Sequence, residues 1–298
     1  MKKLTILTPA YNREKELHNL FNSLCRQNNK DFDWVIVDDG STDNTAHFAE
    51  KCKKDADFEV IYYYKENGGK HTALNFALKK ITTPLVFIVD SDDYLTDDAV
   101  AEINEKDKLY GSDNNLCGFS FLRQKPGSSE YLCRPVPKDG MLSTYCECRV
   151  NGGLDGDMAE VWYTDRLREF PFPEFPGEKF LGEDTVLVKL SGKYNMRFFN
   201  KAIYISAYLD DGLTRNRRRH NIQSPNGCVA RAQAFLDADV DLKHKLKSML
   251  QYFIYGHFAG RDFLELFVSS NHKTFGIICL LPAAVIYRIW KKQFFKRS

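Results

Sequence analysis

Three aspartates stand together after an apolar run, in the segment Leu85-Val86-Phe87-Ile88-Val89-Asp90-Ser91-Asp92-Asp93. The apolar run predicts a buried parallel strand, with the carboxylates at its carboxyl end. Like charges this close destabilise the folded chain unless a cation neutralises them. A hard divalent cation such as Mn²⁺ or Mg²⁺ prefers oxygen ligands and can be shared with a diphosphate. Because ligands of open α/β sheets bind at the carboxyl ends of strands, the segment predicts a metal-bridged nucleotide site.

The same aspartates have a second interpretation, as caps of the helix that follows. Asp is a good N-cap residue, and Asp97 and Asp98 would extend an acidic first turn. The metal site is favoured because the other strand ends of the N-terminal half also carry ligand-type residues.

Polar clusters follow the other predicted strands. After the first strand comes Pro9-Ala10-Tyr11-Asn12-Arg13, where Tyr11 can stack on a base and Arg13 can pair with phosphate. Asp38 ends the second strand and can accept the imide N–H of uracil. A third cluster, Asn67-Gly68-Gly69-Lys70, precedes a helix. Its glycines let the backbone approach a ligand, and the helix N-terminus with Lys70 favours an anion.

The elements that must position these residues alternate along residues 1–110. We expect strands at 4–8, 33–37, 58–64 and 85–89, and helices at 17–25, 43–54 and 69–81. This alternation predicts βαβ units and a parallel sheet, hence the α/β class. Later strands are expected at 116–122, 130–133, 159–164, 196–200 and 203–208, with a helix at 184–191. Beyond residue 222 the pattern is helical.

Three of these segments resemble the signature of the family 2 glycosyltransferases: Thr8-Pro9-Ala10-Tyr11-Asn12, Val37-Asp38-Asp39-Gly40-Ser41-Thr42-Asp43 and Val89-Asp90-Ser91-Asp92-Asp93. The resemblance covers roughly residues 1–215. It implies the GT-A fold, a nucleotide-sugar donor, inversion at the anomeric carbon and a role in bacterial surface polysaccharides such as capsule or lipopolysaccharide.

The resemblance also assigns roles to individual residues. It places Pro9, Ala10, Tyr11 and Asn12 at the nucleoside, Asp38 at uracil and Lys70 near the diphosphate. Asp92 becomes the direct metal ligand, with Asp90 closer to the ribose. In the family pattern Asn-x-Gly-x-x-x-Ala-Arg-Asn, Leu74 stands here in place of the arginine.

An inverting transferase also needs a base for the acceptor hydroxyl. Gly182-Glu183-Asp184-Thr185 matches the Glu-Asp motif of the family. Asp184 is the first candidate and Glu183 the second, because either can point inward from a helix start. Plain N-capping of 185–191 is the alternative. Farther on, the charged segment 210–220 could close over the diphosphate, with His220 as a third metal ligand, or could be a solvated loop.

Residues 275–290 are almost entirely apolar. Sixteen residues interrupted by Pro282 are too few to span a bilayer, which needs about 20. The basic residues Lys291, Lys292, Lys296 and Arg297 follow. The pattern predicts insertion into one leaflet, with the protein cytoplasmic and held peripherally at the inner face of the cell membrane. The alternative is a core helix. Membrane attachment would favour a polyprenyl-linked saccharide acceptor over a free saccharide.

Composition sets the remaining limits. The 298 residues suit a catalytic domain at 1–221, with a nucleotide-binding half at 1–110 and an acceptor half at 111–221. A helical region at 222–298 follows, with its membrane-associating segment at 275–298. A net charge of +2 predicts no nucleic-acid partner. Eight scattered cysteines and no leader before the first strand predict free thiols in a reducing cytoplasm.

Three other functions compete with the transferase. A nucleotidyltransferase that makes a nucleotide sugar would carry a Gly-rich loop with Arg and Lys after the first strand, where this chain has Pro9-Ala10-Tyr11-Asn12. A non-catalytic sugar-binding protein would not need both Asp92 and Asp184. An NAD-linked dehydrogenase would show Gly-x-Gly-x-x-Gly after the first strand.

Overall fold

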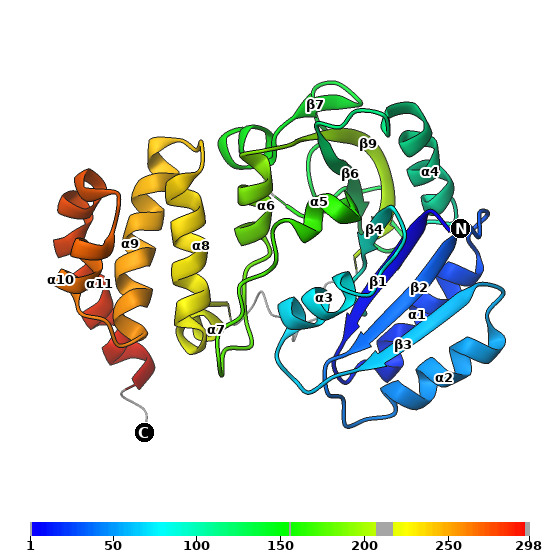
Figure 1. Cartoon of the computed structure of the whole chain (residues 1–298), viewed down its shortest axis with the longest axis horizontal. Coiled ribbons are helices and arrows are strands. Elements are labelled where there is room, and N and C mark those ends of the chain that lie inside the picture. Colours follow the sequence, from blue (N-terminus) through cyan, green and yellow to red (C-terminus); the bar gives the residue numbers. More distant parts are fainter. Residues whose placement is uncertain (1, 155, 207–216, 296–298) are drawn as a thin grey trace.

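The structure, a computed structural model, describes residues 2–154, 156–206 and 217–295. Figure 1 shows a twisted sheet with helices against it and a separate stack of helices at the C-terminal end. The strands are β1 (Leu4–Ala10), β2 (Phe32–Asp38), β3 (Glu59–Tyr64), β4 (Leu85–Ile88), β5 (Tyr94–Leu95), β6 (Leu116–Gln124), β7 (Met141–Ser143), β8 (Met158–Tyr163) and β9 (Asn195–Ile205). The helices between them are α1 (Glu14–Cys25), α2 (Thr45–Asp55), α3 (Lys70–Leu78), α4 (Ala99–Tyr110), the π-helix η1 (Cys146–Asn151), α5 (Thr164–Arg168) and α6 (Asp184–Ser191). The C-terminal helices are α7 (Arg217–Gln223), α8 (Pro225–Asp237), α9 (Leu242–Phe258), α10 (Phe263–Ser269) and α11 (Lys273–Phe295).

The strands form one mixed sheet in the order β3-β2-β1-β4-β8-β6-β9-β5, with β7 also paired to β9. Strand β1 lies parallel to both β2 and β4, and β2 lies parallel to β3. The carboxyl ends of these four strands therefore meet at one edge of the sheet. Strand β8 runs antiparallel to β4 and β6. The predicted α/β class and the parallel N-terminal half are confirmed.

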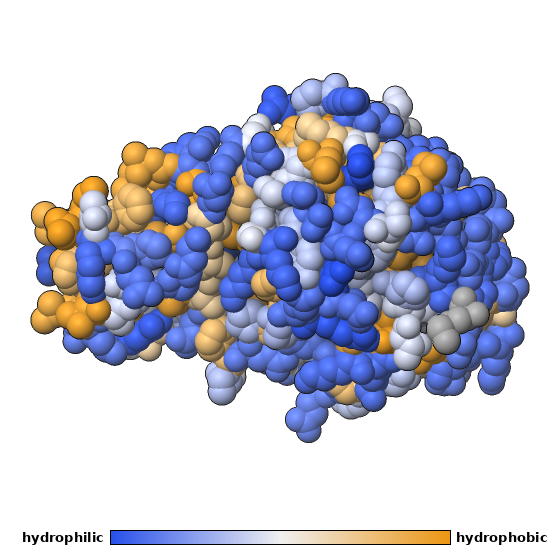
Figure 2. Space-filling model, turned by 45° about the horizontal axis from the view of Figure 1, so that its top comes forward, coloured by the Kyte–Doolittle hydropathy of each residue, from blue (hydrophilic) through white to orange (hydrophobic). Residues whose placement is uncertain are grey.

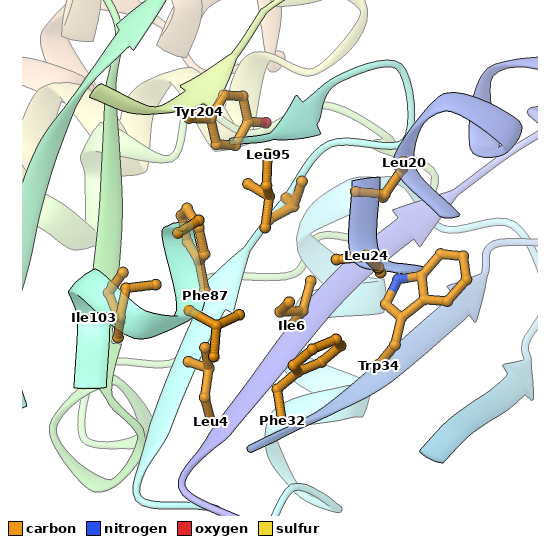
Figure 3. Packing of buried hydrophobic residues seen from close by; sticks show 14 of the residues in the cluster. Leu4, Ile6, Leu20, Leu24, Phe32, Trp34, Phe87, Leu95, Ile103 and Tyr204 are labelled. Atoms are coloured by element: carbon orange, nitrogen blue, oxygen red, sulfur yellow. The ribbon is translucent and has the colours of Figure 1, made fainter. Parts of the chain in front are cut away.

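The two faces of the sheet are covered by different helices. Leu4 and Ile6 point to one face, where they pack with α1, α2 and α4, whereas Leu7 points to the other face, against α3 and α6. Figure 3 shows the first of these clusters, in which Leu20 and Leu24 of α1 lie over β1 and β2. Full burial of one such side chain contributes roughly 1.5–3 kcal/mol, so this alternation fixes the register of the strands.

Several expected boundaries are wrong. Pro9 does not end the first strand, because β1 continues to Ala10 in register with Asp38. The Leu7 carbonyl accepts a hydrogen bond from the Val89 amide, so Leu7 faces β4, and Pro9, two residues later, faces the same side. Strand β4 ends at Ile88, so the N–H that Pro9 lacks would have had no partner there.

Differences also occur in the second half of the chain. The strand expected at 130–133 is a single bridge between Tyr131 and Gln124. The two strands expected at 196–200 and 203–208 are one long strand, β9. Strand β7 and the π-helix η1 were not predicted. The aspartates after β4 do not cap a helix, because α4 begins only at Ala99.

Helices α8, α9, α10 and α11 pack on one another around their own buried cluster, which includes Ala232, Phe253, Leu266 and Ala283. The expected break at Pro282 is wrong, because α11 continues through it. The carbonyl that Pro282 leaves unbonded belongs to Ile278, which is on the exposed side of the helix. At 1.5 Å per residue, α11 extends about 34 Å. By length and composition, 273–294 could cross a membrane. The expected boundary between residues 221 and 222 lies within α7.

Candidate active site

The loop after β1 is tied to the loop after β2. The Asn12 backbone adopts a positive φ of 52°, and its side-chain Oδ1 accepts a hydrogen bond of 2.8 Å from the Thr42 amide. The Asn12 amide in turn donates to Ser41 Oγ at 2.8 Å. These bonds leave the Tyr11 ring 49% exposed beside the buried ends of the strands. A planar ring held in this way can stack on a base.

Two adjacent aspartates end β2 and have different partners. Asp38 accepts hydrogen bonds from the Ser41 amide at 2.7 Å and from the Tyr62 hydroxyl at 2.8 Å. Asp39 binds the amides of Gly68 and Gly69 at 3.0 and 2.7 Å. Asp39 therefore folds the glycine loop against the end of β2, a role that the sequence analysis did not give it. Its position two residues before Ser41, in an Asp-Asp-Gly turn, was the available signal.

Lys70 connects the strand end to the Glu-Asp motif. Its ammonium pairs with Asp90 and with Glu183 Oε1, the latter at 2.5 Å. Burial would raise the pKa of Asp90, but the charges of Lys70 and Arg123, together with the hydrogen bond from Lys70, hold that pKa below its usual value. Sequence positions 70, 90 and 183 thus meet in one ion-pair cluster.

The other two carboxylates of this strand end are crowded, with Asp93 buried and Asp92 partly buried. Burial and the charge of Asp90 together raise the pKa of Asp92, and they raise the pKa of Asp93 to about 7. Asp93 also accepts a 2.8 Å hydrogen bond from the Tyr204 hydroxyl, and Ser91 is buried beside it. Carboxylates held this close are stabilised by a cation.

This donor set suits a hard cation, because Asp90 and Asp92 offer oxygen ligands and carry unfavourable mutual charge. Across the described ranges, no group of three His, Cys, Asp or Glu side chains is arranged to hold a metal by itself. The remaining ligands would have to come from a bound diphosphate or from outside these ranges. His220 stacks on Phe180 at 6.0 Å between ring centroids, and residues 210–216 lie outside the described part of the chain.

A cavity opens beside the Lys70 cluster. Its lining combines charged and apolar side chains: Lys70, Ile88, Asp90, Arg123, Glu160, Trp162, Leu167, Phe172, Glu183 and Leu187. Trp162 is only 3% exposed, and it lines this cavity.

Two charged residues of the cavity were missed in the sequence. Arg123 lies 3.6 Å from Asp93 and stacks at 4.0 Å over the Tyr204 ring. Burial raises the pKa of Glu160 to about 7 against the opposing charges of Arg149 and Arg123. Both interrupt otherwise apolar strands, β6 and β8, and that interruption was the signal that could have found them.

The two carboxylates of the Glu-Asp motif point to different partners. Glu183 lines the cavity and joins Lys70 on the side of Asp90. Asp184, the first residue of α6, instead pairs with Arg231 of α8, with Nε–Oδ1 and Nη2–Oδ2 distances of 2.7 and 2.5 Å. The structure thus brings Lys70, Asp90 and Glu183 together, with Asp184 one residue beyond the cavity wall. Arg231 was also missed, although it is a lone cation within the apolar pattern of α8.

Several known proteins resemble the chain in sequence. Over 111 residues it is 38% identical to poly(ribitol-phosphate) beta-N-acetylglucosaminyltransferase TarS of Staphylococcus aureus, a match that covers 35% of this chain and 19% of TarS. Over 222 residues it is 32% identical to the uncharacterized glycosyltransferase EpsJ of Bacillus subtilis, covering 73% and 62%. The matched region is thus about a fifth of TarS.

Solved structures share the fold. TarS residues 1–349 from S. aureus in complex with UDP-GlcNAc align with a TM-score of 0.61 at 22% identity, over 94% of this chain and 81% of that one. The mannosyltransferase PcManGT from Pyrobaculum calidifontis, in complex with GDP-Man and Mn²⁺, gives 0.56 at 18% identity, over 97% and 83%. The predicted GT-A fold is confirmed. Residues 5–129 match the family described as glycosyl transferase family 2. The chain therefore carries a family 2 glycosyltransferase domain.

Proposed function

We propose that the protein is an inverting glycosyltransferase that moves a sugar from a UDP-sugar to a saccharide acceptor in cell-surface polymer synthesis. One observation carries this proposal. Lys70 and Asp90, from the region that matches family 2, and Glu183 of the Glu-Asp motif pair with one another and line a single cavity. The name of TarS, a beta-N-acetylglucosaminyltransferase acting on poly(ribitol phosphate), supports the hexosaminyl donor class and a wall-polymer acceptor.

The donor nucleoside would bind at the loops after β1 and β2. Pro9, Ala10 and Asn12 would frame it, Tyr11 would stack on the base and Arg13 would approach the phosphates. Asp38 keeps free lone pairs on both carboxylate oxygens after binding Ser41 and Tyr62, so it can still accept the uracil imide N–H. The Gly69 backbone and Lys70 would face the diphosphate.

A divalent cation, Mn²⁺ or Mg²⁺, would be held by Asp92 directly, with Asp90 beside it and diphosphate oxygens completing its shell. When bound, it would neutralise the charge that develops on the leaving diphosphate. Lys70 adds a cation on the same side. Arg123, buried next to Asp93, contributes positive charge that Leu74 does not supply in α3.

The base must lie opposite the leaving diphosphate, because inversion is an in-line displacement. Glu183 is bound to Lys70 on the diphosphate side, whereas its neighbour Asp184 faces the C-terminal helices. This geometry supports Asp184 as the base, with Glu183 as a donor-side group. The Asp184 carboxylate would accept the proton of the acceptor hydroxyl as its oxygen bonds to the anomeric carbon and the bond to the diphosphate breaks.

The C-terminal helices would hold the enzyme at the inner face of the cell membrane, where a lipid-linked acceptor would be found. Exposed apolar side chains form a stripe on α11 (Ile277, Ile278, Leu281, Val285 and Ile289) that α10 extends (Leu264 and Val268). Figure 2 shows hydrophobic residues gathered at this end of the molecule, left in the view. The exposed Lys273, Arg288, Lys291 and Lys292 suit an anionic leaflet.

The opposite face of α11 packs on α9 through Cys279 and Ala283. A helix that crossed the bilayer would need lipid or another apolar partner on all sides. A helix with one face on its own protein and one exposed apolar face suits an interfacial position. We therefore propose attachment to the surface of the membrane without crossing it.

The direct test is a donor panel. The purified full chain would be incubated with UDP-GlcNAc, UDP-Glc, UDP-Gal and GDP-Man in Mn²⁺, and nucleotide release would be measured with and without poly(ribitol phosphate). We expect UDP release from at least one UDP-sugar and none in EDTA. Release from no donor would contradict the proposal, and formation of a nucleotide sugar from sugar phosphate and UTP would replace it with a nucleotidyltransferase.

A further inference from the structure

Helix α8 reaches the catalytic motif through one side chain, Arg231. Its guanidinium makes two parallel hydrogen bonds to the Asp184 carboxylate, and the two side chains are only 19% and 20% exposed. This two-point geometry fixes the direction of the carboxylate as well as its charge. The pair joins the start of α6 to a helix that lies outside the nucleotide-binding half of the chain.

Arg231 is itself held from several sides. Its guanidinium lies 4.5 Å from the centre of the Phe235 ring, and Nη1 donates to Gln251 of α9 at 3.2 Å. At Gly182 there is no room for a side chain, because a Cβ there would lie 2.7 Å from Asp184 Oδ1. The ion pair is therefore clamped between α6, α8, α9 and the backbone before the motif.

A partly buried ion pair of this kind is a poor way to add stability. Removing both charges from water costs free energy that their attraction often only offsets, and an apolar pair would serve as well. The arrangement is better explained by a need to hold the carboxylate in a fixed direction. Arg231 uses one lone pair on each oxygen of Asp184, and the other lone pairs stay available to a hydroxyl.

We propose that Arg231 is a positioning residue for the transfer reaction. It holds the Asp184 carboxylate in a fixed direction while that carboxylate accepts the proton of the attacking hydroxyl, and Gln251 in turn holds Arg231. The inference rests on the proposed role of Asp184 as base. It makes α8 and α9 part of the active site, so the C-terminal helices contribute to the chemistry as well as to attachment.

Substitution of Arg231 tests this proposal. Full-length Arg231→Ala, Arg231→Lys and Asp184→Asn would be compared with the wild type for UDP release from the best donor of the panel and for UDP affinity. The control is Asp237→Asn, which breaks the 2.7 Å ion pair with His272 at the far end of the same helix and touches nothing near Asp184. Circular dichroism and thermal denaturation would check that each variant is folded. If Arg231→Ala does not fold, Arg231→Gln replaces it.

We expect Arg231→Ala to lose roughly tenfold or more in kcat, within the range of general-base catalysis, with UDP affinity and donor KM little changed. Arg231→Lys should be intermediate, because an ammonium cannot make the two-point contact. Added guanidinium chloride, at concentrations that leave the wild type folded, should restore part of the activity of Arg231→Ala. In the Asp184→Asn background, Arg231→Ala should have almost no further effect.

Two results would overturn the inference while the proposed function stands. One is an active wild type whose Arg231→Ala variant keeps its kcat. The other is a loss of kcat in Arg231→Ala that guanidinium does not restore and that adds to the loss from Asp184→Asn. Such a loss would accompany lower thermal stability, as for Asp237→Asn. A wild type that releases no nucleotide from any donor would instead refute the proposed function.

Discussion

At the residue scale, the two carboxylates of the Glu-Asp motif should have separable effects. Asp184→Asn should lower kcat by roughly a hundredfold or more, because a positioned base contributes at least that much. UDP affinity should change little, because Asp184 faces away from the Lys70 cluster. Glu183→Gln should weaken UDP binding more, because it removes a partner of Lys70. Steady-state kinetics and UDP titration would measure both.

The opposite pattern, in which Asp184→Asn weakens UDP binding as much as it slows turnover, would move Asp184 to the donor side. Glu183 would then become the base.

The Glu160 carboxyl should make stability depend on pH. Its pKa of about 7 lies above the value of about 4.3 for an unfolded glutamate, so the folded state retains this proton between those pH values. The stabilisation is therefore full below about pH 4 and is lost as the pH rises to 7. Glu160→Gln should flatten this slope and raise the melting temperature at pH 8 relative to the wild type, by roughly 2–4 °C.

Thermal denaturation at pH 5 and pH 8 would test this, with the exposed Glu66→Gln as control. Part of the slope should survive in the variant, because the pKa of Asp93 is also raised to about 7. A Glu160→Gln protein that melts lower than the wild type at pH 8 would show that this carboxylate stabilises the fold.

At the scale of elements, the glycine loop before α3 should tolerate no side chain at Gly69. Its φ is 95°, and a Cβ there would lie 2.1 Å from the backbone oxygen of Lys179. Gly69→Ala should therefore lower the free energy of unfolding by roughly 2 kcal/mol more than Gly177→Ala. Gly177 has a similar φ of 79° but open space around it, so it isolates the cost of the backbone angle. Denaturant titration would compare the two, and equal losses would refute the close contact.

The sequence predicts the first four strands and their helices well, because apolar runs end in ligand-type turns and each run fills one side of the core. It misplaces elements where local signals conflict with the sheet. Pro9 remains in a strand because β4 has already ended beside it. Residues 130–133 have strand-like composition but form only one β-bridge to β6, between Tyr131 and Gln124.

The residues of the candidate site also fall into two groups, those that the sequence predicts and those whose roles it does not predict. Asp90 and Asp92 could be predicted because they follow a strand end closely, and Lys70 because it begins a helix after a glycine loop. The roles of Arg123 and Arg231 could not be predicted, although each residue stands out as a charge in an apolar pattern. Those roles depend on contacts across 30 residues or more: Arg123 meets Asp93, and Arg231 meets Asp184. No local pattern encodes such a contact. The direction of a side chain at a helix start is likewise set by its distant partner.

At the scale of the whole molecule, the exposed stripe on α11 should control membrane attachment. Combined substitution of Ile277, Leu281, Val285 and Ile289 by Gln should lower partitioning onto anionic phospholipid vesicles at least tenfold. Each of these side chains would lose part of the roughly 1.5–3 kcal/mol that burial contributes. The fold should persist, because these residues point away from α9. Vesicle co-sedimentation at low and high salt would measure the effect.

The matched control places Gln at Leu109 and Leu142, which are exposed on the catalytic part of the chain. Deletion of α11 would be a poorer test, because it would uncover Phe253 and Ala232. A wild-type protein that stays in solution with these vesicles at low salt would refute the attachment, and a quadruple variant that still binds them would move it to another surface.

The central claim is that a divalent metal and a nucleotide diphosphate share the carboxylates after β4. Calorimetric titration of UDP into the wild type, with Mn²⁺ and with EDTA, tests it most directly. Asp92→Asn serves as the test variant, and Asp97→Asn as a control, because Asp97 pairs only with Arg26 at the surface. We predict UDP binding that requires Mn²⁺ in the wild type and Asp97→Asn, and that is lost in Asp92→Asn without loss of fold. Equal UDP affinity in EDTA, or a normal Mn²⁺-dependent affinity in Asp92→Asn, would contradict the account.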